Sequence, residues 1–378
     1  MKSTLFQLKN NAWERSDGQP TDKMTADLVL CFGAKSLLSK PQFLETLQGQ
    51  FDCPEIAVAS TSGEIINSKV QDNSAVAAAI TFDKTTIKSA KINISDYANS
   101  FEAGKGLLHQ LPTENLAYLL ILSDGSLVNG SELVNGLNDE LKGKVLITGG
   151  LAGDGSNFQS TLTGLNDIPA EGVIVAIGFY GDSLVVKDGS EGGWEIFGLD
   201  KTVTKSTSNK LYELNGQNCL DVYKRYLGEA ADRLPAAALN FPLSVLIPGN
   251  NKTVVRTILG ISENDNSMTF AGDLPEGSIV RFMKTNFSSL IDAAASSAKK
   301  TIPINKKAPD FALLVSCVGR KIVLGQRVNE EVEAVHNAYQ GLTPMLGFYS
   351  YGEIAPLLNE KATALHNQTM TITSFYEI

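Results

Sequence analysis

The sequence predicts an α/β fold with mixed sheets flanked by helices, and three observations support this prediction. Three strand-like segments each end in a glycine followed by an acid, at Gly63-Glu64, Gly153-Asp154 and Gly352-Glu353. Apolar runs alternate with segments of helical periodicity, a pattern that favours parallel strands joined by helical crossovers. The 378 residues are 43% apolar and 19% charged, which is ordinary for a globular α/β protein with an ample core.

Each glycine–acid pair belongs to a unit of strand, helix, strand, glycine–acid turn and closing strand. Three related copies of one unit indicate an internal repeat. The expected strands and helices are 26–33, 41–51, 56–60 and 74–82 in the first unit; 117–124, 130–141, 145–148 and 172–180 in the second; and 311–317, 329–339, 345–349 and 366–375 in the third.

The segments outside these units differ in character. Residues 1–25 are polar and predict an irregular N-terminal arm. Residues 86–94 alternate apolar and polar side chains, as a half-exposed strand does, and a helix is expected over 99–111. Residues 183–305 do not repeat the unit; they predict a β-rich middle insertion that ends in a helix over 286–300.

Composition and motifs exclude several classes of function. The net charge of −9 disfavours nucleic acid or an anionic membrane as the main partner. The four cysteines are widely spaced, so neither a zinc clamp nor a redox pair is indicated. The chain has no P-loop, HExxH or kinase signature, no signal-peptide pattern and no apolar run long enough to span a membrane. We therefore expect a cytoplasmic protein.

A set of short motifs, in this order along the chain, resembles the FIST family of bacterial sensory proteins. The matching residues are 62–65, 149–154, 192–194, 203–204, 214–216 with Tyr223, 256–261, 316–320, 347–354 and 365–369. The resemblance covers about residues 26–375. It implies a FIST N-terminal domain at 26–220 and a FIST C-terminal domain at 221–378, after the arm at 1–25.

The resemblance also implies a function. FIST domains resemble small-ligand sensors in signal transduction. A stand-alone member of this length is similar to the haem proteins of the family that sense nitric oxide and regulate a partner histidine kinase or cyclic-di-GMP enzyme. The alternative is a haem-independent sensor of an amino acid or related metabolite. The oligomeric state stays open, a homo-oligomer included.

A haem-based sensor needs an axial ligand, and His366 is the first candidate. The chain has three histidines, and His366 opens the last strand within the family's Leu-His-Asn segment. The competing interpretation is a strand-end histidine bonded to backbone. Tyr349, Tyr351 and Cys317 are secondary ligand candidates.

Three further residues are candidates for binding a ligand. Arg320 follows a buried strand and a glycine, where its guanidinium is placed to hold a carboxylate, either of a ligand or of Glu353 or another acid. Glu353 is a candidate partner for a ligand amine, or for Arg320. Trp194 lines a pocket or covers a sheet. Catalysis is disfavoured because Cys317 has no histidine at a spacing that indicates activation, so we expect a protein that is not an enzyme.

Overall fold

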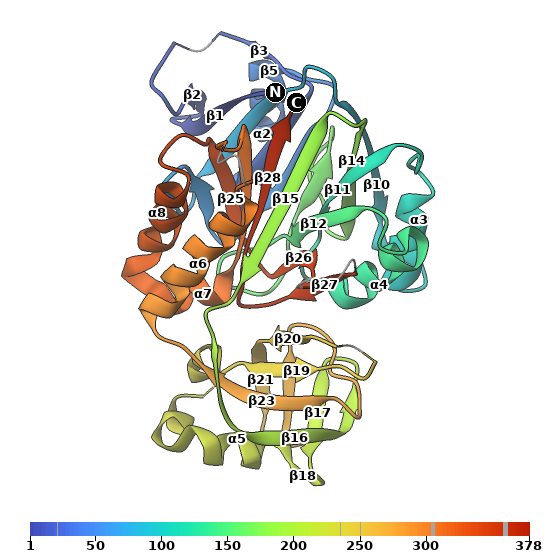
Figure 1. Cartoon of the computed structure of the whole chain (residues 1–378), viewed down its shortest axis with the longest axis vertical. Coiled ribbons are helices and arrows are strands. Elements are labelled where there is room, and N and C mark those ends of the chain that lie inside the picture. Colours follow the sequence, from blue (N-terminus) through green and yellow to red (C-terminus); the bar gives the residue numbers. More distant parts are fainter. Residues whose placement is uncertain (21, 235, 250, 304–306, 358–361) are drawn as a thin grey trace.

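The chain folds into a main body and a smaller β-rich domain, which Figure 1 shows below it. This computed structural model describes residues 1–378 except 21, 235, 250, 304–306 and 358–361. The small domain begins with β16 (Glu195–Thr207), ends with β23 (Ile279–Lys284), and lies in the chain between two elements of the main body. The prediction of mixed sheets flanked by helices, with a β-rich insertion, is confirmed.

Three six-stranded sheets form the main body, each built on the first strand of one predicted unit. That strand pairs in parallel with the strand after its helix and antiparallel with the closing strand. The groups are β4 (Leu28–Gly33), β6 (Ile56–Ser60) and β9 (Ala75–Thr81); β11 (Leu116–Ser123), β12 (Leu146–Leu151) and β14 (Val173–Tyr180); and β24 (Phe311–Cys317), β25 (Met345–Ser350) and β28 (Met370–Glu377).

Each unit also places a strand in the sheet of a neighbouring unit. Strand β7 (Glu64–Ile66) pairs with β25, β26 (Gly352–Pro356) with β12, and β13 (Thr163–Leu165) with β6. The first unit thus donates to the third, the third to the second, and the second to the first. Strands β8 (Lys69–Gln71) and β27 (Thr363–His366) extend two of these exchanges as hairpins.

Beyond its closing strand, each sheet is extended by a segment that precedes the unit. Strands β1 (Lys2–Lys9), β10 (Thr86–Asn93) and β15 (Leu184–Glu191) pair antiparallel with β9, β14 and β28. The sequence predicts an irregular arm over residues 1–25, but this segment contains β1 and its partner β2 (Ala12–Arg15). It also contains β3, which pairs with β5; these short strands span Met24–Thr25 and Phe51–Asp52.

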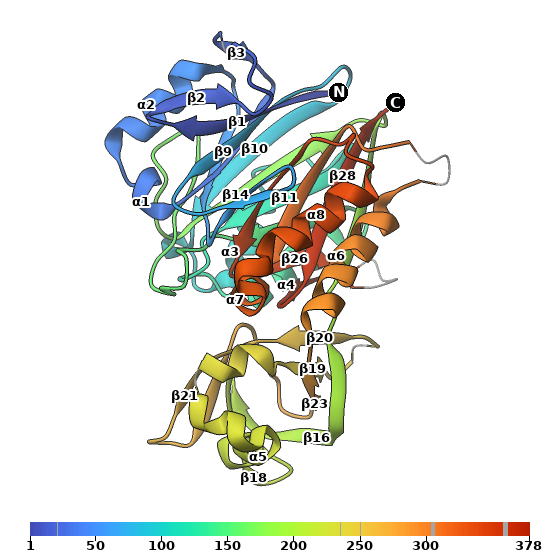
Figure 2. The ribbon, with the colours of Figure 1, turned by 90° about the vertical axis from the view of Figure 1, so that its left-hand side faces the viewer.

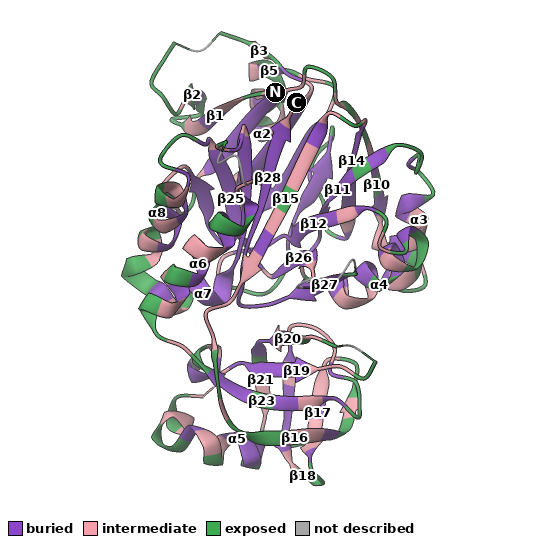
Figure 3. Ribbon diagram, in the orientation of Figure 1, coloured by how far each residue is buried: buried purple, intermediate pink, exposed green. Residues whose placement is uncertain are grey.

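One hydrophobic core fills the space between the inner faces of the three sheets. Leu30 of β4, Leu120 of β11 and Leu313 of β24 are all buried in it, and Figure 3 shows the central strands buried along most of their length. Helices cover the outer faces (Figure 2). They are α1 (Lys35–Leu38) and α2 (Pro41–Gln50); α3 (Ser100–Leu108) and α4 (Gly130–Leu141); and α6 (Phe287–Thr301), α7 (Val318–Leu324) and α8 (Val328–Ala338).

Helix α4 illustrates why these segments are helical. The Asn129 side chain accepts hydrogen bonds from the backbone N–H groups of Ser131 and Glu132, which caps the first turn. Leu133 and Leu137 lie one turn apart and are buried against the sheet. The cap and the apolar face together fix where the helix begins and which side packs.

The small domain is a curled sheet with an α-helix packed on it. Its core includes Tyr223 of the helix and Phe282 of β23, and the boundary expected after residue 220 falls inside it. Within the described ranges, no helix is long and apolar enough to cross a membrane. The other elements of the small domain are β17 (Lys210–Leu214), β18 (Gln217–Asn218), α5 (Cys219–Leu227), β19 (Leu243–Leu246), β20 (Thr253–Arg256), β21 (Ile258–Ser262) and β22 (Ser267–Phe270).

Close strand contact in the second sheet makes Gly149 a sensitive position. A Cβ there would lie 1.9 Å from the Ile121 carbonyl oxygen, and Gly149 has a φ of +152°. We expect Gly149→Ala to lower the free energy of unfolding in urea by about 2–3 kcal/mol, as overpacking does. Gly49→Ala, in α2 with open space around it, is the control and should be neutral or slightly stabilising. Equal stabilities for the two variants would contradict this account.

Candidate functional site

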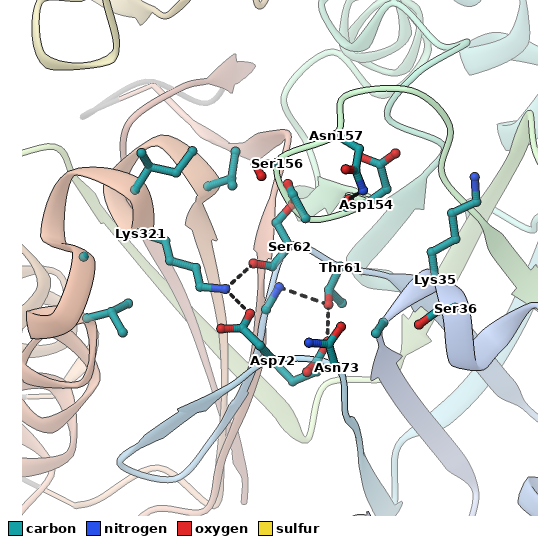
Figure 4. A pocket seen from close by; sticks show the side chains of 18 of the residues that line it. Lys35, Ser36, Thr61, Ser62, Asp72, Asn73, Asp154, Ser156, Asn157 and Lys321 are labelled. Atoms are coloured by element: carbon teal, nitrogen blue, oxygen red, sulfur yellow. Dashed lines mark hydrogen bonds and ion pairs between the residues drawn. The ribbon is translucent and has the colours of Figure 1, made fainter. Parts of the chain in front are cut away.

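A cavity of about 800 Å³ lies beyond the carboxyl ends of β4 and β6, and we call it the apical cavity. Open α/β sheets bind ligands in this position because the loops after parallel strands gather there. All three units contribute to its lining. The side chains labelled in Figure 4 are Lys35, Ser36, Thr61, Ser62, Asp72, Asn73, Asp154, Ser156, Asn157 and Lys321.

The wall of the cavity at the end of β6 is held by a buried acid. Glu64 accepts hydrogen bonds from the Thr61 hydroxyl at 2.5 Å and the Ser74 hydroxyl at 2.6 Å. Burial raises the pKa of Glu64. Thr61 also accepts the Gly63 N–H at 3.2 Å. These bonds fix the turn after β6, so the wall is preformed.

Charged side chains of both signs border the cavity. Lys321 of α7 pairs with Asp72 and donates to the Ser62 carbonyl at 2.7 Å. Lys35 of α1 donates to the Ser160 hydroxyl, and Figure 4 shows Lys35 and Lys321 on opposite sides. Two ammonium groups in a cavity that carboxylates also line give a site that complements a small ligand with both charges.

The second glycine–acid pair shapes the loop over the cavity. Asp154 accepts the backbone N–H groups of residues 158, 159 and 160, at 2.9, 3.1 and 3.2 Å. The Tyr351 hydroxyl also donates to Asp154. Tyr351, a ligand candidate from the sequence, thus lies beside this loop and stacks on Phe158 at 4.7 Å between ring centroids.

Glu353 occupies the position in the third unit that Glu64 occupies in the first. It is fully buried and accepts the Ser350 hydroxyl at 2.8 Å, the Thr369 hydroxyl at 2.9 Å and the Thr369 N–H at 3.1 Å. Burial raises its pKa to about 7. The structure therefore gives Glu353 the same turn-holding contacts as Glu64.

Arg320 is fully buried and its guanidinium is engaged within the protein. It pairs with Glu331 at 2.6 Å, and its Nη2 also donates to the Leu290 carbonyl at 2.8 Å. The Tyr349 hydroxyl donates to the other Glu331 oxygen at 2.8 Å. Cys317 lies nearby at the end of β24, where burial raises the pKa of its thiol. The structure thus brings Arg320 and Tyr349 together in a closed network.

Residues 366–369 connect this network to the small domain. The Gln368 carbonyl accepts the Trp194 indole N–H at 2.9 Å and an Arg320 N–H at 3.3 Å. Its side-chain amide donates to the Leu239 carbonyl of the small domain at 3.2 Å. Trp194 therefore anchors the start of the small domain to the main body.

The surroundings of His366 do not fit haem. Its Nε2 lies 3.1 Å from the Ala355 carbonyl oxygen, so the usual ligating nitrogen is engaged. Burial lowers the pKa of His366 to about 4. The adjacent cavity of about 620 Å³ is bordered by charged side chains, which a haem plane does not favour; they are Asp188, Glu191, Lys252 and Lys300. No cluster suited to a metal ion occurs among the residues that the structure describes.

Sequence reasoning did not select Lys35, Asp72 or Lys321, which border the apical cavity. Lys35 lies two residues after the end of β4, and Lys321 lies four residues after the end of β24, so both lie just beyond strand carboxyl ends. A position just beyond the carboxyl end of a strand was the sequence signal that could have identified these two lysines. Asp72 lies far along the chain from Lys321, and only the exchange of β7 into the third sheet brings them together.

Titration of Glu353 predicts a pH-dependent stability. Between pH 4.5 and 7 the glutamate is ionised in the unfolded chain and protonated in the fold, so the folded state binds more protons. The free energy of unfolding should fall through this range, by on the order of 3 kcal/mol. Urea unfolding of Glu353→Gln should show a flatter profile than the parent protein.

Two features make this measurement specific to Glu353. The lowered pKa of His366 gives an opposite trend between pH 4 and 6.5, but both proteins share it and it cancels in their difference. Glu114→Gln, at an exposed position, is the control. A Glu353→Gln profile parallel to that of Glu114→Gln would show that Glu353 does not titrate in this way.

Comparison with known families identifies both halves of the chain. The FIST N domain model matches residues 27–217, and the FIST C domain model matches residues 219–356. No curated protein matches the sequence significantly. FIST domains are associated with the sensing of small ligands in signal transduction. Because the two models account for most of the sequence, the chain belongs to the FIST family.

Proposed function

We propose that this protein is a sensor that binds a small polar metabolite, of the amino-acid kind, in the apical cavity. The observation that carries the proposal is the pair of ammonium groups, from Lys35 and Lys321, on opposite sides of a cavity bordered by Asp72 and Asp154. A ligand carboxylate would pair with a lysine, and a ligand amine with an aspartate. The sensory association of the family supports the same conclusion.

Binding here would act on all three units at once. Their turns are already joined by backbone hydrogen bonds, from Ser62 N–H to the Tyr349 carbonyl at 2.8 Å and from Gly153 N–H to the Ser60 carbonyl at 2.9 Å. A ligand that contacts Lys35, Asp154 and Lys321 would touch one residue from each unit. Its differential affinity for one arrangement of the units would shift their equilibrium.

Helix α7 offers a route from the cavity to the small domain. Lys321 borders the cavity, whereas its neighbour Arg320 donates to the carbonyls of Gly192 and Gln368 at the junction. If Lys321 moved toward a ligand carboxylate, α7 would move with it. Arg320, on the same short helix, would then shift its contacts at the junction between the main body and the small domain. The output would pass to a partner signalling enzyme. The histidine kinase or cyclic-di-GMP enzyme implied by the family resemblance stays a prediction.

A panel of amino acids in a thermal-shift assay tests the proposal. A ligand at one hundred times its dissociation constant stabilises the fold by about 2.7 kcal/mol, which is a clear shift. Lys321→Met should weaken binding by about ten- to one-hundredfold, because a charge-assisted hydrogen bond is lost. Lys144→Met, at an exposed position outside the cavity, should bind like the parent. Equal binding by Lys321→Met and Lys144→Met would refute the site.

Haem supplied during expression separates this proposal from a gas sensor. If the apical cavity is the sensory site, purified protein should show no stoichiometric Soret band, because Nε2 of His366 is engaged with the Ala355 carbonyl. Absorption spectra before and after nitric oxide, for the parent and His366→Ala, give the answer. A stoichiometric band that shifts with nitric oxide and is lost in His366→Ala would replace the present proposal with haem-based sensing.

A further inference from the structure

A second cavity, of about 430 Å³, lies between the main body and the small domain. The main body contributes the start of α4 and the loop after Asp154, and the small domain contributes the segment after β22. The volume lies in the range of small-molecule sites. Because both domains line it, a ligand there would contact both.

Exposed apolar side chains from both domains gather at this interdomain cavity. Leu127 and Phe158 of the main body are 57% and 42% exposed, and Leu259 of the small domain is 48% exposed. Large apolar groups exposed around one cavity, rather than scattered singly, mark a binding surface. The surface is suited to a flat, partly apolar ligand.

Phe158 has a backbone conformation that is unusual for a bulky side chain. Its φ is +54°, the left-handed region that bulky side chains rarely adopt. Its N–H donates to Asp154 at 2.9 Å and lies 2.9 Å from the Tyr351 hydroxyl oxygen. Its ring lies nearly parallel to that of Tyr351, at an interplanar angle of 18°. Backbone strain that exposes an aromatic ring at a cavity is typical of a functional position.

The polar side of the cavity offers a hydrogen-bond acceptor. Asp273 of the small domain lines it, and its carboxylate accepts long hydrogen bonds, 3.2 and 3.4 Å, from the Asn129 amide. A carboxylate has capacity for about four such bonds. The buried Arg256 guanidinium lies close enough to act on Asp273 electrostatically, which favours a neutral N–H donor over a cation as the additional partner.

We propose that the interdomain cavity binds a planar nitrogen heterocycle that carries an amino group, of the nucleobase or nucleoside class. The ring stacks on the Phe158–Tyr351 pair, and the amino group donates to Asp273. Stacking on an aromatic side chain contributes substantially to nucleobase affinity. This site is separate from the apical cavity, and the loop of residues 154–160 borders both.

Isothermal titration with adenosine and with purine riboside, which lacks the 6-amino group, tests the site. Adenosine should bind at one molecule per chain. Purine riboside should bind about tenfold more weakly or worse, because it has no N–H group on its ring to donate to the Asp273 carboxylate. Asp273→Asn should reduce this discrimination. Absence of saturable adenosine binding, or equal binding of the two nucleosides, would overturn the proposal.

Phe158→Asn separates a binding role from a structural one. Asparagine tolerates positive φ, so this variant should melt at the parent temperature or above it while the dissociation constant for adenosine rises about tenfold or more. Phe287→Ala, also 42% exposed but outside the cavity, should bind adenosine normally. A lower melting temperature for Phe158→Asn with unchanged adenosine affinity would show a purely structural residue and refute the site.

Discussion

The cyclic exchange of strands among the three sheets is the constraint on which the rest of the structure depends. Each unit leaves its own sheet at a tight turn and adds a strand to a neighbour, so main-chain hydrogen bonds join every pair of units. Backbone donors and acceptors buried in this way must be paired. No sheet can therefore separate from the core without breaking a ladder in another sheet, and the turns meet at one end of the body.

The acids after the turn glycines explain how the exchange is held, and why one unit differs. In the first and third units a hydroxyl three residues before the acid, Thr61 or Ser350, bonds to it, and a hydroxyl before the closing strand completes the set. The second unit has Leu151 at the first of these positions. Asp154 is consequently free to cap its own loop, which then borders both cavities. The one unit that departs from the threefold pattern thus contributes the loop that borders both candidate sites.

The repeat and most elements could be predicted because they depend on local signals. Apolar runs, helical periodicity and glycine–acid turns lie within single segments, and α4 begins at Gly130, where the sequence places it. The strands of residues 1–25 could not be recognised, because β1 and the edge strand β2 have mostly polar side chains and few buried ones, such as Phe6 and Trp13. The exchange of strands is a long-range pairing, and no local pattern encodes it.

The candidate site was harder to predict for the same reason. Arg320 follows the end of a strand, which made it a reasonable candidate for binding a ligand. In the structure its guanidinium pairs with Glu331 of the next helix, α8. Its neighbour Lys321 points to the other side of the short α7 and borders the cavity. Adjacent residues on a helix face directions about 100° apart, so one residue can anchor the small-domain junction while the next contacts a ligand. The separation of roles between Arg320 and Lys321 follows from helix geometry, and it places the junction and the cavity on one rigid element.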